Sequence, residues 1–120
     1  MIANTFGIKG MGAVNWLATQ GINTPEQPNR WLAQDGIRVL RLGHGEYLVD
    51  GPAAIALRAA WQAQPVGNAW LVPRYDAVFA FDVAAGRRVL PEICALDTRP
   101  EVMGSSVFMT LAAGISVTLV

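Results

Sequence analysis

The sequence predicts an α+β fold made of two tandem ferredoxin-like (split β-α-β) units, the second of them incomplete at the C-terminus. Three observations support this prediction. Residues 74–120 show the order strand, helix, strand, strand. Residues 1–73 show the same order followed by another helix and strand, and short motifs recur at matching places in both stretches. We therefore interpret residues 1–120 as a single domain with an internal pseudo-repeat, β-α-β-β-α-β in residues 1–73 and β-α-β-β in residues 74–120.

The second copy shows its elements most clearly. Residues 75–81 are rich in aromatic and β-branched side chains, which favours a strand, and residues 84–95 have the composition of a helix. Residues 106–120 read as two strands around Gly114, and we expect this glycine to sit at a hairpin tip with a positive φ angle.

The first copy begins with a short alternating strand at residues 5–9, followed by a helix at residues 11–20 and a proline-containing loop. Residues 37–42 and 46–50 form a predicted hairpin around a Gly-His-Gly tip. Trp31 and Leu32 either extend the first strand of this hairpin or pack beneath it.

The remainder of the first copy contains one more helix and one more strand. Asp50-Gly51-Pro52 starts the helix, because Asp or Gly is a favourable N-cap and proline is tolerated in the first turn. This helix is rich in alanine and runs to about Gln64, and residues 68–72 form the closing strand.

The two copies share short motifs at equivalent places. The segment FGI at residues 6–8 matches FAF at residues 79–81, and VLRL at residues 39–42 matches FMTL at residues 108–111. Gly45 and Gly114 both lie three residues beyond the leucine that ends the second motif. We therefore expect the two glycines to occupy equivalent hairpin tips, each with a positive φ angle.

Composition limits the function classes. The chain is 52% hydrophobic and 15% charged, with nine basic and nine acidic residues and a formal net charge of zero. It shows no basic stripe with interleaved aromatic residues and no apolar run long enough for a bilayer, so we expect neither a nucleic-acid nor a membrane partner. A single cysteine, Cys94, cannot form an internal disulfide, which favours a cytoplasmic protein. The apolar excess predicts contact with another protein.

One glycine pair lies where a phosphate-binding loop would lie. Gly10-x-Gly12 stands between a predicted strand and a helix, but the dinucleotide fingerprint requires a third glycine where this chain has Asn15. We interpret the pair as a tight turn.

The same motifs carry a resemblance to a known family. The segments FAF at 79–81, LPEICALD at 90–97, VFMTLAAGISV at 107–117 and RLGHGEYL at 41–48 resemble the gamma subunit of heterotetrameric sarcosine oxidase. The resemblance implies a fold related to the folate-binding aminomethyltransferases of the glycine-cleavage T-protein type, in a subunit that docks on flavin-bearing oxidase subunits. It implies no catalytic residue and no cofactor bound by this chain alone. Flavin, with tetrahydrofolate as a further candidate, would belong to the complex.

A second resemblance, to the tRNA-modifying, folate-dependent YgfZ-like group, is less complete. The cysteine of that group follows a lysine and a glycine, whereas Cys94 lies in the segment PEICAL. We interpret Cys94 as a buried helix residue, with a reactive thiol as the alternative.

Few side chains qualify as functional candidates. His44 is the only histidine, with Glu46 as its sole nearby partner, and we expect a solvated turn residue and no metal site. Arg41 and Arg74 are candidates for binding a carboxylate such as that of folate, with surface or capping salt bridges as the simpler alternative. The four tryptophans, interpreted as core anchors and not as a pterin platform, are Trp16, Trp31, Trp61 and Trp70.

Two functions follow as hypotheses. The first is a non-catalytic structural subunit of a sarcosine oxidase-like, flavin-dependent amine oxidase complex. The alternative is a stand-alone folate-binding protein of the aminomethyltransferase type. Because residues 115–120 would form an apolar edge strand without charges, we expect the isolated chain to form a homo-oligomer near this strand.

Overall fold

The computed structural model describes residues 4–74 and 76–120. The chain divides into two compact units, Met1–Val78 and Phe79–Val120, which are described separately below. No helix in the described ranges combines the length and apolar character that crossing a bilayer requires.

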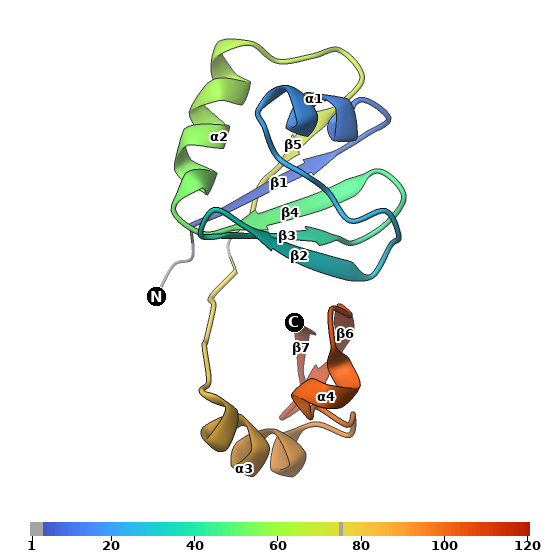
Figure 1. Ribbon diagram of the computed structural model, residues 1–120, viewed down its shortest axis with the longest axis vertical. Helices are drawn as coiled ribbons and strands as arrows, with labels where there is room; N and C mark the ends of the chain where they lie inside the picture. The colour runs from blue at the N-terminus through green and yellow to red at the C-terminus, as the bar shows by residue number, and fades with distance from the viewer. Residues whose placement is uncertain (1–3, 75) are drawn as a thin grey trace. The chain divides into compact units, whose positions relative to one another are not determined.

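The first unit contains five strands and two helices (Figure 1). In chain order these are β1 (Thr5–Lys9), α1 (Ala13–Thr19), β2 (Arg30–Gln34), β3 (Ile37–Arg41), β4 (Glu46–Asp50), α2 (Ala53–Ala63) and β5 (Trp70–Val72).

The five strands form one antiparallel sheet in the order β2-β3-β4-β1-β5. β4 lies between β1 and β3, which is the split β-α-β arrangement, and β5 closes the far side of β1. The predicted ferredoxin-like unit is therefore confirmed, with β2 as an additional edge strand.

The additional strand settles the position of Trp31 and Leu32. Both lie in β2, which pairs antiparallel with β3 through a two-residue turn at Asp35 and Gly36. These turn residues have φ angles of 48° and 79°, as a tight hairpin turn with two left-handed residues requires. Trp31 and Leu32 were predicted to extend β3 or to pack beneath it, so this hairpin was not predicted.

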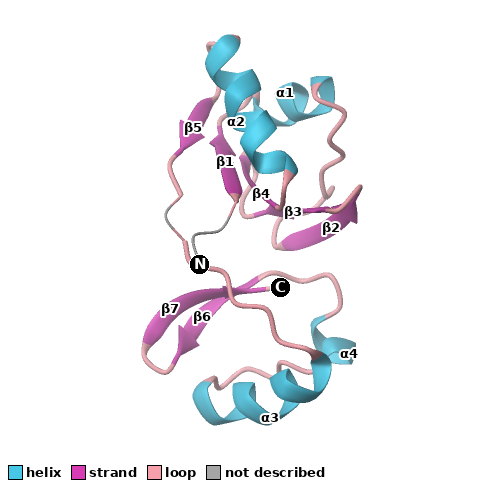
Figure 2. Ribbon diagram, turned by 90° about the vertical axis from the view of Figure 1, so that its left-hand side faces the viewer, coloured by secondary structure: helices cyan, strands magenta, loops and turns pink. Residues whose placement is uncertain are grey.

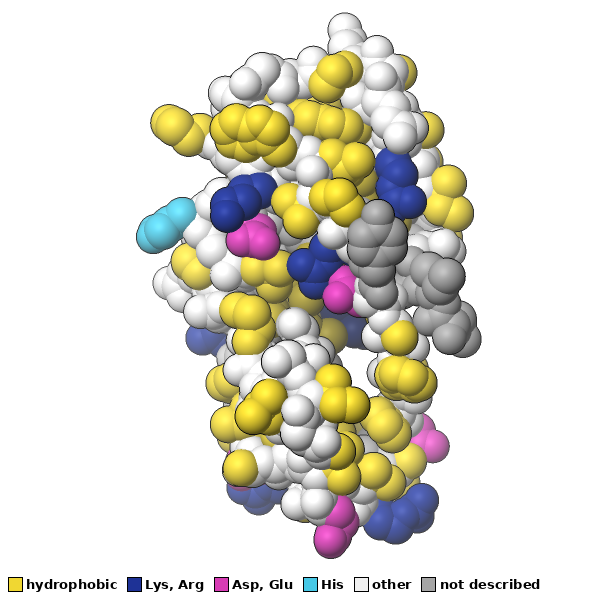
Figure 3. Space-filling model, turned by 180° about the vertical axis from the view of Figure 1, so that it is seen from behind, with side chains coloured by type: hydrophobic (Ala, Val, Ile, Leu, Met, Phe, Trp, Pro, Cys, Tyr) yellow, Lys and Arg dark blue, Asp and Glu magenta, His cyan; other side chains and the backbone are white. Residues whose placement is uncertain are grey.

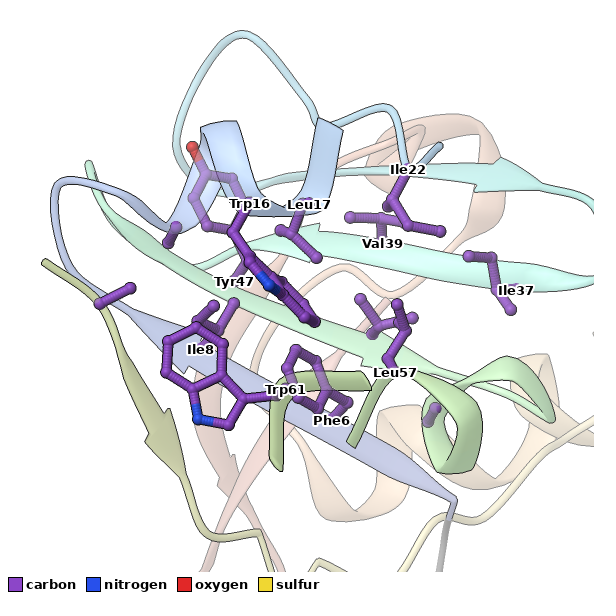
Figure 4. Packing of buried hydrophobic residues seen from close by; sticks show 14 residues of the cluster. Phe6, Ile8, Trp16, Leu17, Ile22, Ile37, Val39, Tyr47, Leu57 and Trp61 are labelled. Carbon is purple, nitrogen blue, oxygen red and sulfur yellow. The ribbon is translucent and has the colours of Figure 1, made fainter. Parts of the chain in front are cut away.

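One face of the sheet carries the hydrophobic core. α1 and α2 both pack on this face, so Phe6 and Ile8 of β1 lie beneath them without exposed surface (Figure 4). The ring of Trp16 stands 5.4 Å from that of Phe6 and 5.2 Å from that of Trp61, in a T-shaped contact with the latter. Full burial of a side chain of this size stabilises a fold by about 1.5–3 kcal/mol, so these rings anchor both helices to the sheet.

The opposite face of the same sheet carries a second row of apolar residues. Leu40 is directly opposite Leu48, and Leu48 is directly opposite Gly7 of β1. A Cβ atom at Gly7 would lie 2.9 Å from the carbonyl oxygen of Val72 and 3.1 Å from Cγ of Arg74. Glycine is therefore needed here because the last residue of β5 and the side chain of Arg74 lie close to β1.

The second unit contains two helices and one hairpin (Figure 1). Its elements are α3 (Val83–Ile93), α4 (Pro100–Met103), β6 (Phe108–Ala112) and β7 (Ile115–Leu119). The carboxylate of Asp82 accepts a 2.7 Å hydrogen bond from the backbone N–H of Ala85, which caps the start of α3. Proline stands at the first position of α4, where its missing N–H costs no helix hydrogen bond.

The hairpin of the second unit forms where the sequence predicted it. β6 and β7 pair antiparallel through Ala113 and Gly114, with φ angles of 50° and 79°. The positive φ angle predicted for Gly114 is confirmed. Gly45 has no positive φ angle, so the same prediction is wrong for that residue.

The predicted strand at residues 75–81 is not found. Tyr75 lies outside the described residues, and residues 76–82 contain only an isolated bridge position at Ala77 before the chain enters α3 (Figure 2). Phe79 is 77% exposed, whereas Phe6, its counterpart in the first copy, is fully buried. Strand-forming composition is not sufficient, because a strand also needs a neighbour to pair with and a face to bury.

Candidate functional site

Arg41 lies at the end of β3 and joins two loops. Its guanidinium donates hydrogen bonds to the carbonyl oxygens of Gly43 (3.1 Å) and His44 (2.9 Å) in the loop before β4. It also donates to the carbonyl oxygens of Pro25 (3.3 Å) and Glu26 in the loop before β2. All three guanidinium nitrogens are thus engaged with the backbone. A carboxylate ligand would have to displace these carbonyl groups.

Arg74 lies elsewhere in the first unit. Its Nε is 2.6 Å from Oδ2 of Asp76, an ion pair in which the Asp76 side chain is 45% exposed. The Arg74 stem packs over Gly7, on the face of the sheet opposite the helices. Arg41 instead extends toward Tyr47 on the core face, with Cζ 5.8 Å from the ring centre. The two candidate arginines therefore do not converge on one ligand.

The Gly10-x-Gly12 turn binds the protein's own carbonyl groups. The N–H of Gly10 donates to the Gly45 oxygen at 2.9 Å, and the N–H of Gly12 donates to the Asn68 oxygen at 3.0 Å. The next N–H, that of Ala13, donates back to the Gly10 oxygen at 3.1 Å. A phosphate-binding loop needs such N–H groups to point at the ligand. These groups instead bind the chain itself, which fits the interpretation of the glycine pair as a tight turn.

An open hollow of about 470 Å³ lies at the end of the β2–β3 hairpin. Trp31, Arg38 and Asp50 line it, but neither Arg41 nor Arg74 does. The Arg38 guanidinium lies over the Trp31 ring, with Cζ 5.2 Å from the ring centre. The hollow is wide open to solvent and does not enclose a ligand as typical small-molecule sites do.

The other candidates take structural positions. Cys94 is buried just after the last residue of α3, where its backbone bridges to Ala112 of β6. His44 is exposed on its loop, and the described part of the chain contains no cluster of three metal-ligating side chains. Trp16 and Trp61 are core anchors as predicted, but Trp70 is 63% exposed.

The second unit exposes an apolar surface. Few of its large hydrophobic side chains are buried, and many are open to solvent on the hairpin and before α3 (Figure 3). Residues 102–120 contain no Asp, Glu, Lys, Arg or His. We call the exposed hydrophobic residues of this unit the apolar surface of the second unit; they are Phe79, Phe81, Val83, Ile93, Leu96, Val102, Phe108, Met109, Leu111, Ile115 and Val120.

Two exposed ion pairs of the second unit, Arg99–Asp97 and Arg87–Glu101, involve residues of α4 or the segment just before it. Arg99 holds the Asp97 carboxylate through Nε at 2.8 Å and Nη2 at 2.6 Å, and the backbone N–H of Arg99 also donates to it at 3.2 Å. These hydrogen bonds lower the pKa of Asp97 to about 2. Arg87 pairs with Glu101 at 2.9 Å. Exposed ion pairs of this kind contribute little to the stability of the folded state.

Comparison with known proteins adds one relationship. Neither a protein-family model nor a curated protein matches the sequence at a significant level. Among solved structures, a chain of the heterotetrameric sarcosine oxidase from Corynebacterium sp. U-96, in complex with pyrrole 2-carboxylate, superimposes with a TM-score of 0.61. This chain shares its fold with that sarcosine oxidase chain. The similarity covers 98% of this chain at 21% identity, but only 66% of the matched chain.

The fold similarity agrees with the resemblance to sarcosine oxidase that the sequence motifs suggested, and the relation to the folate-binding aminomethyltransferases stays a prediction. It also agrees with the packing character of the motifs, because the segments at 41–48 and 107–117 lie mostly in strands and turns. The apolar surface of the second unit was foreseen only in part, as a general excess of hydrophobic residues and as an apolar edge at residues 115–120. The signal that located it is the absence of ionisable residues after Glu101.

Proposed function

We propose that this chain is a non-catalytic structural subunit of a heteromeric, sarcosine oxidase-like, flavin-dependent amine oxidase complex. Its partners would be the flavin-bearing oxidase subunits, which would supply the redox cofactor and the site of amine oxidation. With a single unpaired cysteine, we also propose the cytoplasm as its location.

The observation that carries this proposal is the apolar surface of the second unit. Contiguous exposed apolar surface beyond a few hundred square ångströms is uncommon on soluble monomers and marks sites of protein interaction. Here Met109 and Leu111 are exposed on one face of a hairpin without any charged residue, and Ile115 is exposed on its other face. The fold similarity to a chain of a heterotetramer supports the same assignment.

A stand-alone folate-binding protein has less support from the geometry. Folate carries carboxylates, and Arg41 and Arg74 are the residues considered for binding them. Arg41 is engaged with four backbone carbonyl groups, and Arg74 is paired with Asp76. Binding at either place would begin by breaking interactions that the protein already makes.

The proposal is tested by purifying the tagged chain from its native source. We expect stoichiometric co-purification of subunits that carry flavin absorbance and amine oxidase activity. The Met109→Asp variant should lose these subunits, because a carboxylate on the apolar surface would have to be desolvated on docking. Met11→Asp is the matched control, since Met11 is also exposed (91%, against 65% for Met109) but lies in the first unit.

Two results would contradict the proposal. The first is a chain that purifies alone from a source that contains amine oxidase activity. The second is loss of the oxidase subunits in both aspartate variants to the same extent, because the apolar surface of the second unit would then have no special role.

A further inference from the structure

The two outer edges of the hairpin of the second unit differ, because that of β6 is bridged at one residue and that of β7 at none of the described residues. On the outer side of β6, Ala112 forms a bridge with Cys94, and the neighbouring Ala113 N–H donates to the Ile93 oxygen at 2.8 Å. β7 pairs with β6 alone among the described residues. The outer N–H and C=O groups of β7 are therefore in a position to pair with another strand.

The sequence of β7 is chemically symmetric about its central residue. Reading Ile115–Leu119 in either direction gives apolar, hydroxyl, apolar, hydroxyl, apolar, with Val117 at the centre. Side chains of a strand alternate between its two faces. The apolar residues Ile115, Val117 and Leu119 therefore share one face, while Ser116 and Thr118 share the other.

We propose that the open edge of β7 is a self-association site whose partner is β7 of a second copy of this chain. The two strands pair antiparallel about a two-fold axis at Val117. In this register Val117 is opposite Val117 of the second copy, and Ile115 is opposite Leu119. Ser116 is opposite Thr118, so hydroxyl groups also meet hydroxyl groups.

Three features favour a second copy as the partner. Every apolar residue of β7 meets an apolar residue in this register, and cross-strand apolar and Ser–Thr pairs both stabilise sheets. No charged residue occurs in residues 102–120, so two copies of this edge meet without repulsion. A two-stranded hairpin is marginally stable by itself, and pairing of two copies makes a four-stranded sheet.

A closed two-fold pairing of this kind also limits its own growth. Each copy uses the edge of β7 once, and on the other side of the hairpin β6 is bridged to Cys94 at Ala112. The expected product is a dimer and not a fibre, because the interface is isologous.

Single-cysteine cross-linking tests the register. In a Cys94→Ser background, we expect Val117→Cys to form a disulfide-linked dimer on mild oxidation, because directly opposite residues bring their Cβ atoms close enough for a disulfide. Ser116→Cys is the matched control, since it is opposite Thr118 and should cross-link about tenfold more slowly. Mixing the separate Ser116→Cys and Thr118→Cys proteins should restore rapid cross-linking between the two.

Sedimentation of the unmodified chain over a dilution series tests the dimer without any cysteine variant. We expect a monomer–dimer equilibrium that Ser116→Lys shifts to monomer, because a charged residue on an edge strand opposes pairing. A monomer at all concentrations would overturn the proposal. A dimer that Ser116→Lys leaves intact, or equal cross-linking at positions 116 and 117, would also overturn it. These measurements use the isolated chain, so their outcome is independent of any oxidase partner.

Discussion

Gly45 lies directly against Gly10, where the loop before β4 meets the turn after β1. The Gly10 N–H donates a 2.9 Å hydrogen bond to the Gly45 oxygen, and a Cβ atom at Gly45 would lie 2.9 Å from the Gly10 oxygen. This contact joins two backbone segments, neither of which can rotate away as a side chain would.

Gly45→Ala should therefore destabilise the first unit by about 1–3 kcal/mol, as expected when a methyl group is forced into a closely packed contact. Gly43→Ala is the matched control in the same loop, because its nearest neighbour would be Cβ of Glu46 at an ordinary 3.9 Å. Chemical denaturation of both variants is the measurement. Equal stabilities would show that the loop adapts and that the close approach of Gly45 and Gly10 is not required.

Gly114→Ala should also destabilise, but for a different reason. Gly114 has a φ angle of 79° and open space around its missing Cβ, so the cost is conformational, about 1 kcal/mol. Gly67→Ala meets open space as well but has no positive φ angle, so it should be neutral or slightly stabilising. Amide exchange would report the difference, measured in the β6–β7 hairpin for Gly114→Ala and in α2 and β5 for Gly67→Ala. Unchanged exchange in Gly114→Ala would contradict the strain argument.

Gly45 and Gly114 show how far the internal repeat could be predicted from the sequence. Both stand immediately before a strand, β4 or β7, so the positional match is sound. The preceding loops differ in length, four residues before β4 and two before β7, and so the backbone angles differ. The pair with two positive φ angles that resembles Ala113 and Gly114 is Asp35 and Gly36, in a hairpin that the sequence analysis did not identify.

Most of the first unit was predictable because the hydrophobic pattern of each main strand or helix matches another element that packs against it. Phe6 and Ile8 alternate with outward residues in β1, and α1 and α2 supply the apolar groups that cover them. The segment around Phe79 has similar composition but is not a strand of either described sheet, and composition alone could not reveal that difference. The candidate arginines failed to converge for a related reason. The partners of Arg41 are backbone carbonyl groups, which a sequence does not display.

Arg41→Met should loosen the two loops that the guanidinium joins. The lost hydrogen bonds involve a charged donor and are partly buried, so we expect a destabilisation of about 1.5–3 kcal/mol. Faster proteolytic cleavage within residues 20–29 should accompany it. Arg74→Met is the comparison, because its ion pair with the exposed Asp76 is worth about 0–1 kcal/mol. Equal effects of the two substitutions would contradict a clamping role for Arg41.

Asp97 should titrate unusually low. Its hydrogen bonds from Arg99 lower the pKa to about 2, whereas an unperturbed aspartate titrates at about 3.9. A depressed pKa in the folded state means that the stabilising contribution is complete above pH 3.9 and is lost as the pH falls toward 2. Carbon-13 NMR titration of the carboxyl group is the measurement. In Arg99→Leu the pKa should return toward its ordinary value, and an unshifted wild-type Asp97 would show that the pair with Arg99 does not persist in solution.

The purified chain should be colourless and should show no amine oxidase activity. At the turn Gly10-x-Gly12, a dinucleotide pyrophosphate would need free backbone N–H groups. The N–H groups of Gly10, Gly12 and Ala13 all donate to carbonyl groups of the chain itself. Gel filtration followed by an absorption spectrum tests this directly, with the co-purified complex as the positive control. A flavin spectrum that travels with the isolated chain would show that it binds the cofactor at another place and that its role in the complex is not purely structural.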